Sequence, residues 1–287
     1  MKYQAPREKP RDTLRILHLS DVHAGLGEWR WKYLLDKRLF GRLNQFLTRQ
    51  GRLHLENLQS LADAAPAWGV DLVVCTGDVT SIGSREEFLH ARQLLDPLAK
   101  AVGNSFVYVP GNHDAYVKAN SHALAEAFRS FNPLLKQGLD ELPATITLDN
   151  LELVLLSPAR PTLPWYSNGE LAPSDWAKLE YILSRPIQGG ARLLLTHFPL
   201  LKGNAAPLGL RTRMAGWERL AKWGRDGRFQ ALLCGHIHKP FNLTPETAGF
   251  HQVDAGSISI NNSFAIVDVC KNTGTITPYT LYFKEQQ

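Results

Sequence analysis

The sequence predicts an α/β fold in which several parallel strands end at one shared site. Short apolar runs alternate along the chain with segments of helical period. The run over residues 71–76 is apolar almost throughout, which is typical of a parallel strand buried on both faces. Several such runs end in a carboxylate, an amide or an imidazole. Because sites in open α/β sheets form outside the carboxyl ends of the strands, we expect these side chains to converge.

The composition is that of a globular protein with a sizeable core. Hydrophobic residues make up 44% of the 287 residues, and we expect one domain over 1–287. Residues 1–13 are polar and charged, and no apolar run approaches the roughly 20 residues that span a bilayer, so we expect a cytoplasmic protein. The three cysteines lie in apolar runs, which predicts buried thiols and no disulfide. The formal charge of +5 favours an anionic substrate or surface.

The first apolar run, residues 14–19, leads directly into Asp21 and His23. Side chains two apart on an extended segment project to the same side, so this pair is predicted to bind the same ligand. The alternative is a helix cap at Asp21 beside an incidental histidine.

Residues 29–52 are the least expected segment. Apolar residues recur there at spacings of three and four with lysine and arginine between them, which predicts a basic amphipathic helix. One interpretation is a lid that packs its apolar stripe on its own protein. The other is an insert that lies on an anionic membrane surface or gates a lipid-bearing substrate. Because the segment follows Asp21 and His23, we expect it to hang over the mouth of the site.

The remaining helices and strands are predicted from hydrophobic periodicity and from residues typical of helix ends and turns. Ser84 and Glu87 have the spacing of a capping box, Pro173 suits a first helical turn, and Asp149-Asn150 suits a hairpin turn. Helices are predicted over 54–68, 84–101, 121–131, 173–184 and 217–224. Further strands are predicted over 71–76, 106–109, 144–149, 152–156, 192–196, 229–234, 250–254, 263–270 and 275–283.

Five of the predicted strands end in candidate ligands. Gly77 and Asp78 follow 71–76, and residues 110–114, which read Pro-Gly-Asn-His-Asp, follow 106–109. Turn chemistry is the alternative for 110–114. The two later strands end at His197 and at the pair formed by His236 and His238. The candidates are Asp21, His23, Asp78, Asn112, His113, Asp114, His197, His236 and His238.

A long loop is predicted over 200–213, beside the site. Arg211 and Arg213 in this loop are available to contact a phosphate or another anion of the substrate. The alternative is that both arginines belong to the solvated surface.

The mixture of imidazole and carboxylate groups suits Mn, Fe or Zn, and there are more candidate ligands than one tetrahedral ion uses. We therefore expect two divalent ions, with Mn as the first choice. Two such ions clamp a phosphate and make a hydroxide available near neutral pH. Asp78 stands in the middle of the set and is predicted to lie between the ions.

The series Asp21-x-His23, Gly77-Asp78, residues 111–114, His197 and residues 235–238 resembles the calcineurin-like metallophosphoesterase superfamily over roughly residues 14–240. The resemblance implies a four-layer α/β/β/α sandwich with two mixed sheets. It also implies that one ion is held by Asp21, His23, Asp78 and His238, and the other by Asp78, Asn112, His197 and His236. His113 is similar to the family's histidine that acts on the phosphate without binding metal, and Asp114 is expected to orient it.

Within the superfamily the chain resembles the bacterial phosphodiesterase branch, which includes UDP-diacylglucosamine pyrophosphatases. This predicts cleavage of a phosphodiester or pyrophosphate bond by metal-bound hydroxide, on a lipid-linked nucleotide if the segment 29–52 brings the enzyme to the inner membrane as a peripheral protein. The alternatives are a soluble cyclic-nucleotide phosphodiesterase and a non-enzymatic scaffold that retains the metals. Nucleic acid is not expected as a substrate, because no basic and aromatic side chains interleave across a strand platform.

Overall fold

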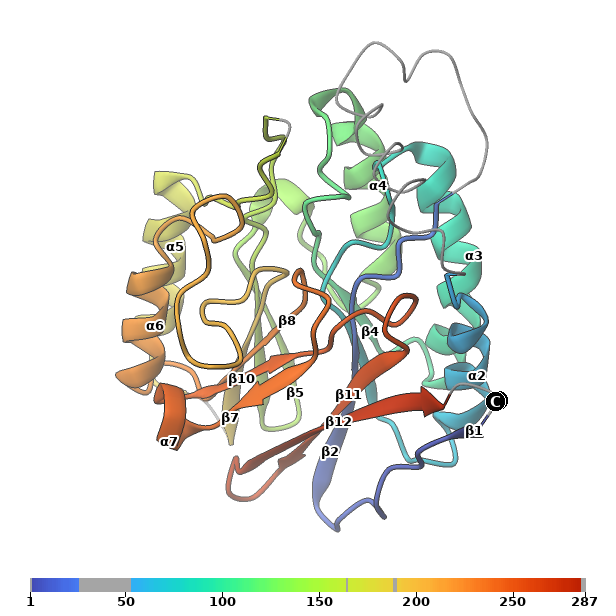
Figure 1. Cartoon of the computed structure of the whole chain (residues 1–287). Helices are drawn as coiled ribbons and strands as arrows, with labels where there is room; N and C mark the ends of the chain where they lie inside the picture. Colours follow the sequence, from blue (N-terminus) through green and yellow to red (C-terminus); the bar gives the residue numbers. More distant parts are fainter. Residues whose placement is uncertain (1, 26–52, 164, 188–189, 285–287) are drawn as a thin grey trace.

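A computed structural model describes residues 2–25, 53–163, 165–187 and 190–284 (Figure 1). The predicted insert at about 29–52 therefore lies outside the described residues, and the single-domain assignment stays a prediction. Among the described helices, none is long and apolar enough to cross a membrane. The three cysteine thiols are free, and Cys75 and Cys234 are buried as predicted, whereas Cys270 is partly exposed.

Two mixed six-stranded sheets form the centre of the molecule. The first sheet has the order β1-β12-β11-β2-β3-β4, and in it β2, β3 and β4 are parallel. Its strands are β1 (Lys2–Tyr3), β2 (Thr13–Leu19), β3 (Leu72–Cys75), β4 (Phe106–Tyr108), β11 (Ser263–Cys270) and β12 (Ile276–Lys284).

The second sheet has the order β5-β6-β7-β8-β10-β9, with β6, β7, β8 and β10 parallel. Its strands are β5 (Ala144–Leu148), β6 (Leu151–Leu155), β7 (Ala191–Leu195), β8 (Ala231–Cys234), β9 (Phe241–Leu243) and β10 (His251–Asp254).

The helices cover the outer faces of the sheets (Figure 1). They are α2 (Glu56–Ala64), α3 (Arg85–Ala101), α4 (Ser121–Phe131), α5 (Pro173–Ser184), α6 (Trp217–Arg225) and α7 (Pro245–Ala248). Short 3-10 turns lie at Lys118–Asn120 and Leu139–Glu141. In β7, Leu193 and Leu195 join the core that the two sheets share, whereas Leu194 packs with α5 and α6. This alternation produces four layers, helix, sheet, sheet and helix, so the predicted α/β/β/α sandwich is confirmed.

Most predicted elements are present within a residue or two of their expected ends. Ser84 caps α3 and its side chain accepts a hydrogen bond from the backbone N–H of Glu87. The helix predicted over 54–68 is shorter, because α2 is followed by a turn that contains Pro66. The elements β1, β9 and α7, which have two to four residues, were not predicted.

The register of the parallel strands aligns their carboxyl ends. Leu19 lies opposite Cys75, and Cys75 lies opposite Tyr108 in the first sheet. In the second sheet Leu195 lies opposite Leu233. The loops that follow β2, β3, β4, β7 and β8 therefore leave their sheets at corresponding levels, and these loops hold the candidate ligands.

Candidate metal centre

The candidate ligands lie on loops with unusual backbone conformations. Asp21 and His23 were expected on an extended segment, but their φ angles are +56° and +50°, so the extended geometry is wrong and both residues are left-handed. Asp78, His236 and His238 also have positive φ values, of 51°, 79° and 55°. Each left-handed non-glycine residue costs on the order of 1–3 kcal/mol. Such strain clusters at functional sites, where it aims side chains that a regular strand would point elsewhere.

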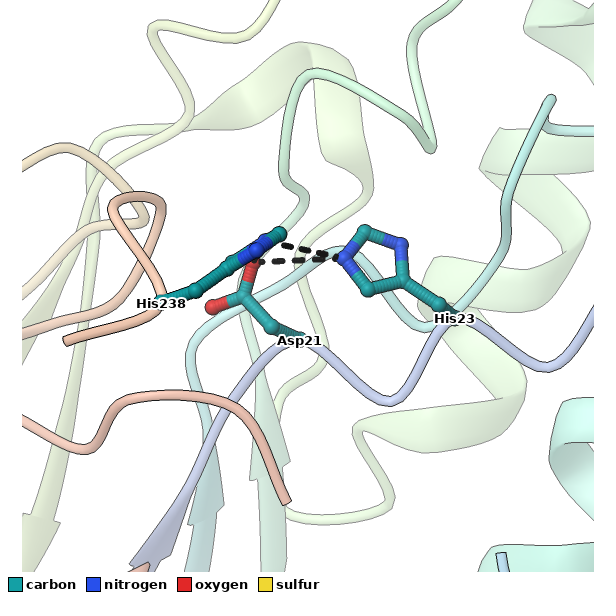
Figure 2. A group of neighbouring side chains, drawn as sticks. All are labelled: Asp21, His23 and His238. Carbon is teal, nitrogen blue, oxygen red and sulfur yellow. Dashed lines mark hydrogen bonds and ion pairs between the residues drawn. The ribbon is translucent and has the colours of Figure 1, made fainter. Parts of the chain in front are cut away.

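The first donor group joins the loop after β2 to the loop after β8 (Figure 2). Nε2 of His238 lies 3.0 Å from Oδ1 of Asp21, and Nε2 of His23 lies 3.6 Å from the same oxygen. The two Nε2 atoms are 3.1 Å apart. Asp21 and His23 are fully buried, whereas His238 keeps 28% of its side chain exposed. One carboxylate oxygen and two imidazole nitrogens thus point at a common centre.

The second donor group joins the loops after β3, β4, β7 and β8. Nε2 of His197 lies 3.2 Å from Oδ1 of Asn112 and 3.2 Å from Nδ1 of His236. It also lies 3.3 Å from Oδ2 of Asp78. Four donor atoms from four loops are therefore within reach of one ion.

Backbone carbonyls fix which nitrogen of two imidazoles faces this group. Nδ1 of His197 lies 2.7 Å from the carbonyl oxygen of Thr76, and Nε2 of His236 lies 3.0 Å from that of Thr212. A carbonyl only accepts, so these two nitrogens carry the hydrogens and donate them. The opposite nitrogens of the two rings then face each other at 3.2 Å, an arrangement that requires a proton or a cation between them.

Asp78 belongs to both donor groups. Its carboxylate comes within 4.8 Å of ligand atoms of Asp21 and His23, in the first donor group, and of His197, in the second. The backbone N–H of His113 donates to its Oδ1 at 2.7 Å, which holds the carboxylate in place. Burial of two carboxylates at one point is unfavourable unless cations neutralise them, so this donor set fits two divalent ions that share Asp78.

Two glycines let the backbone pass close to the carboxylates. A Cβ at Gly111 would lie 2.2 Å from Oδ1 of Asp78, and a Cβ at Gly235 would lie 2.4 Å from Oδ2 of Asp21. Neither distance is compatible with van der Waals contact. The glycines next to the predicted ligands are therefore needed for space.

In the metal-free protein, burial and neighbouring charges shift the pKa values of the ligand side chains. Burial by itself raises the pKa of the Asp21 carboxyl, but His238 and hydrogen bonds from His23 and His238 hold it well below its usual range. Burial lowers the pKa of His197, yet the charge of Asp78 overcomes this and raises it to about 10. Burial and the charge of His197 lower the pKa of His236 to about 3. The metal-free site thus holds a proton on His197 that a divalent ion must displace.

His113 lies beside the first donor group, with its ring centroid 5.0 Å from that of His23. Its Nδ1 lies 2.6 Å from the carbonyl oxygen of Ser81, so Nδ1 carries a hydrogen and donates it. Sequence reasoning expected Asp114 to orient this ring, and that expectation is wrong. The Asp114 carboxylate instead accepts from the backbone of the loop after β3 and from the side chains of Thr80 and Tyr108.

Asp114 therefore ties two ligand loops together. Its Oδ2 accepts from the N–H of Gly111 at 3.0 Å, in the loop after β4, and from that of Val79 at 3.3 Å, in the loop after β3. Burial and the neighbouring charge of Asp78 raise the pKa of Asp114 to about 6. The residue supports the positions of Asp78 and Asn112 without contacting the His113 ring.

Arg211 and Arg213 flank Thr212, whose carbonyl oxygen accepts from His236. Arg211 is exposed and its guanidinium lies 5.9 Å from the ring centre of Tyr166, whereas Arg213 is half-buried. The loop predicted beside the site therefore does lie beside it. A role of either arginine in substrate binding stays a prediction.

Sequence reasoning missed several groups that support the ligands. Besides the carbonyls of Thr76, Ser81 and Thr212, the buried hydroxyls of Ser257 and Ser259 donate to the carbonyl oxygen of Asp21 at 2.7 and 3.2 Å. Carbonyls leave no signal in a sequence because every residue has one. The two serines did leave a weak signal, since they are polar residues in a short apolar stretch between two strands.

Comparison with known proteins gives relatives in both sequence and structure. A cAMP/cGMP dual specificity phosphodiesterase of Mycobacterium tuberculosis is 29% identical over 237 residues, which cover 83% of this chain and 65% of that protein. A glycerophosphodiester phosphodiesterase of Enterobacter lignolyticus is 30% identical over 176 residues, 61% of this chain and 57% of that protein. This chain thus spans somewhat less than two thirds of the length of either relative.

The structural likeness covers nearly the whole chain. A dimetal phosphatase from Danio rerio matches 94% of this chain and 99% of its own length, with a TM-score of 0.62 and 13% identity. A purple acid phosphatase from yellow lupin matches 96% of this chain and 55% of its own, with a TM-score of 0.58 and 10% identity. At such identities the likeness supports the fold. The family model for calcineurin-like phosphoesterases matches residues 14–240, and the chain belongs to that family.

Proposed function

We propose that this protein is a hydrolase that cleaves a phosphodiester or pyrophosphate bond with the help of two divalent metal ions. The observation that carries the proposal is the convergence of two donor groups on the shared carboxylate of Asp78. The proposed ligands are Asp21, His23, Asp78, Asn112, His197, His236 and His238. When bound, two divalent ions supply Lewis-acid activation of a water molecule and of a phosphate oxygen.

The charges of the site suit a phosphate substrate. The donor set contains two carboxylates, Asp21 and Asp78, and five neutral ligands, because imidazole binds metal in its neutral form. Two dications therefore leave a net positive charge at a buried position. That charge attracts and orients an anionic phosphate, and an uncharged ester would gain much less from it.

His113 is the proposed proton donor. Its Nδ1–H is held by the Ser81 carbonyl at 2.6 Å, which fixes the ring and keeps Nε2 available for proton transfer. In the imidazolium form Nε2 also carries a hydrogen, and this proton can pass to the leaving oxygen as the bond to phosphorus breaks, which leaves a neutral ring with its hydrogen on Nδ1. Asp114 acts indirectly. Its carboxylate accepts hydrogen bonds from the backbone of the loops that carry Asp78 and Asn112 and so holds these loops in place.

Two substrate classes have specific support. Cyclic nucleotides are supported by the name of the Mycobacterium tuberculosis relative, which is a cAMP/cGMP phosphodiesterase. A lipid-linked nucleotide is supported by exposed apolar side chains on a loop beside the site, and this substrate would make the protein peripheral to the cytoplasmic face of the membrane. Manganese is the first choice of metal, since it suits mixed nitrogen and oxygen ligands.

A substrate screen on metal-reconstituted protein tests the proposal. Protein stripped with a chelator is reloaded with Mn²⁺, Zn²⁺ or Fe²⁺ and assayed against bis(p-nitrophenyl) phosphate, cyclic AMP, a nucleoside diphosphate-linked lipid and p-nitrophenyl phosphate. We expect metal-dependent turnover of at least one diester or pyrophosphate, above that of the monoester. Preference for the monoester would contradict the proposal. Binding of two ions without turnover of any compound would instead support the scaffold alternative.

A further inference from the structure

The loop between β6 and α5 carries a patch of exposed apolar side chains. Leu163 and Trp165 are 73% and 69% exposed, and Tyr166 is 41% exposed. Leu210, 73% exposed, lies on the neighbouring loop, in which the carbonyl oxygen of Arg211 accepts from the backbone N–H of Ser167 at 2.8 Å. We call Leu163, Trp165, Tyr166 and Leu210 the rim patch. Large exposed apolar side chains that gather in one place mark an interaction site.

The rim patch lies beside the metal centre. Arg211 links it to Thr212, whose carbonyl oxygen is 3.0 Å from Nε2 of His236. Figure 1 shows the loop projecting from the end of the molecule at which β2 and β3 end. The patch is thus a projection next to the entrance of the site, and a small ligand would be poorly enclosed by it.

The chemistry of the rim patch fits a lipid surface. Tryptophan and tyrosine prefer the boundary between headgroups and acyl chains, and leucine prefers the acyl chains. Arg211, which lies over the Tyr166 ring at 5.9 Å, and Arg213 add positive charge beside the patch. Positive charge next to exposed apolar side chains complements anionic headgroups.

Other occupants fit less well. Leu163 and Leu210 are as exposed as Trp165, and a leucine offers no ring for a nucleobase to stack on. A stable protein interface buries roughly 800 Å² on each partner, more than four side chains on a loop tip supply. We infer that the rim patch docks the mouth of the metal centre onto an anionic lipid bilayer. The inference rests on the proposed function only for the nature of the substrate, since docking itself needs no catalysis.

A matched pair of double variants tests this inference. In the first, Trp165→Ser and Leu210→Ser remove one aromatic and one leucine from the rim patch. In the control, Tyr181→Ser and Leu89→Ser remove the same types of side chain, 67% and 53% exposed, from α5 and α3. The full-length protein is sedimented with vesicles of phosphatidylcholine containing phosphatidylglycerol. We expect the rim variant to bind at least about tenfold more weakly than the wild type, and the control to bind as the wild type does.

Equal binding of the rim variant and the wild type, or no binding of the wild type, would overturn the inference. Weak vesicle binding of both double variants would do so as well. A raised KM for cyclic AMP in the rim variant with unchanged vesicle binding would identify the patch as a substrate platform and overturn it too. Brominated lipids give a second readout. They should quench the tryptophan fluorescence of the wild type more than that of the Trp165→Phe variant.

Turnover of water-soluble bis(p-nitrophenyl) phosphate separates this inference from the proposed function. Both double variants should keep the wild-type rate, because none of the four side chains belongs to the metal centre. Vesicle binding without turnover of any diester or pyrophosphate would leave the docking surface standing and refute the hydrolase. Turnover without vesicle binding would support the hydrolase and refute the docking surface.

Discussion

Both sheets bury charged groups at their two ends, but the two ends differ in how the described residues balance these charges. Away from the metal centre, Arg15 in β2 is paired with Asp268 in β11, and Arg192 in β7 with Glu152 in β6, each pair facing across neighbouring strands. Arg15 is 1% exposed, and its remaining donors reach three backbone carbonyls. The guanidinium and the carboxylate therefore neutralise each other.

At the carboxyl ends of β2, β7 and β8, groups of one kind face one another. Two histidine nitrogens stand 3.1 Å apart in the first donor group and two stand 3.2 Å apart in the second. Such contacts gain nothing in the absence of a proton or a cation. Buried charge therefore does not by itself mark a functional site, since the buried arginine pairs lie away from the metal centre. A buried set whose lone pairs exceed its hydrogens does mark one.

The strongest test of this contrast replaces the shared carboxylate. Asp78→Ala removes a ligand from both donor groups, so we expect the protein to lose its bound metal and turnover to fall to the uncatalysed level. Metal content by mass spectrometry, together with diester turnover, measures both effects. A variant that retains two ions and most of its activity would show that Asp78 is not shared between them.

Replacing His113 should separate chemistry from metal binding. We expect His113→Ala to reduce kcat by about 10²- to 10⁴-fold, because the proton for the leaving oxygen is lost, while metal content stays unchanged. A substrate with a very acidic leaving group needs less protonation and should lose less activity. If both substrates slow equally, His113 acts on something other than the leaving oxygen.

The opposite end of the sheets should respond in stability. Arg15→Ala leaves the buried Asp268 with the more distant Arg7, whose Nε is 3.9 Å from its Oδ2, as a weaker partner, and we expect the free energy of unfolding to fall by about 3 kcal/mol. Chemical denaturation measures this loss. The double replacement Arg15→Met with Asp268→Leu removes both charges and should recover most of it. Loss of metal from the folded Arg15→Ala protein would refute the separation of the two ends.

A smaller effect is expected from crowding a ligand without removing it. The Cβ of Gly235→Ala would press on Oγ of Ser20 at 2.0 Å and on Oδ2 of Asp21 at 2.4 Å, and we expect metal affinity to fall by about 10- to 100-fold, as for the loss of a supporting contact. Gly209→Ala is the control, because the nearest atom to its Cβ is 4.0 Å away. Metal titration of the two variants gives the comparison, and equal affinities would show that the loop accommodates the methyl group.

The donor groups were predictable because each leaves two signals in the sequence. An apolar run ends at a glycine, and a carboxylate or imidazole follows, as at Asp78 and His236. The rule that parallel strands end at one edge then brings these residues together. The four-layer arrangement came from the resemblance, and the register of the strands agrees with it.

The backbone conformation of the ligand loops could not be predicted from the sequence. Nothing in the run before Asp21 indicates that the chain turns left-handed there, so the pair was expected on an extended segment. Asp114 was assigned to its neighbour in sequence, but the chain turns its carboxylate back to Thr80 and Tyr108. The carbonyls that orient His197 and His236 are likewise set by the path of the chain.

Anomalous diffraction from crystals grown with Mn²⁺ would locate the ions themselves. We expect two peaks about 3.5–4 Å apart, with the Asp78 carboxylate touching both. One peak should lie against Asp21, His23 and His238, and the other against Asn112, His197 and His236. A single peak, or two peaks that do not share Asp78, would contradict this expectation.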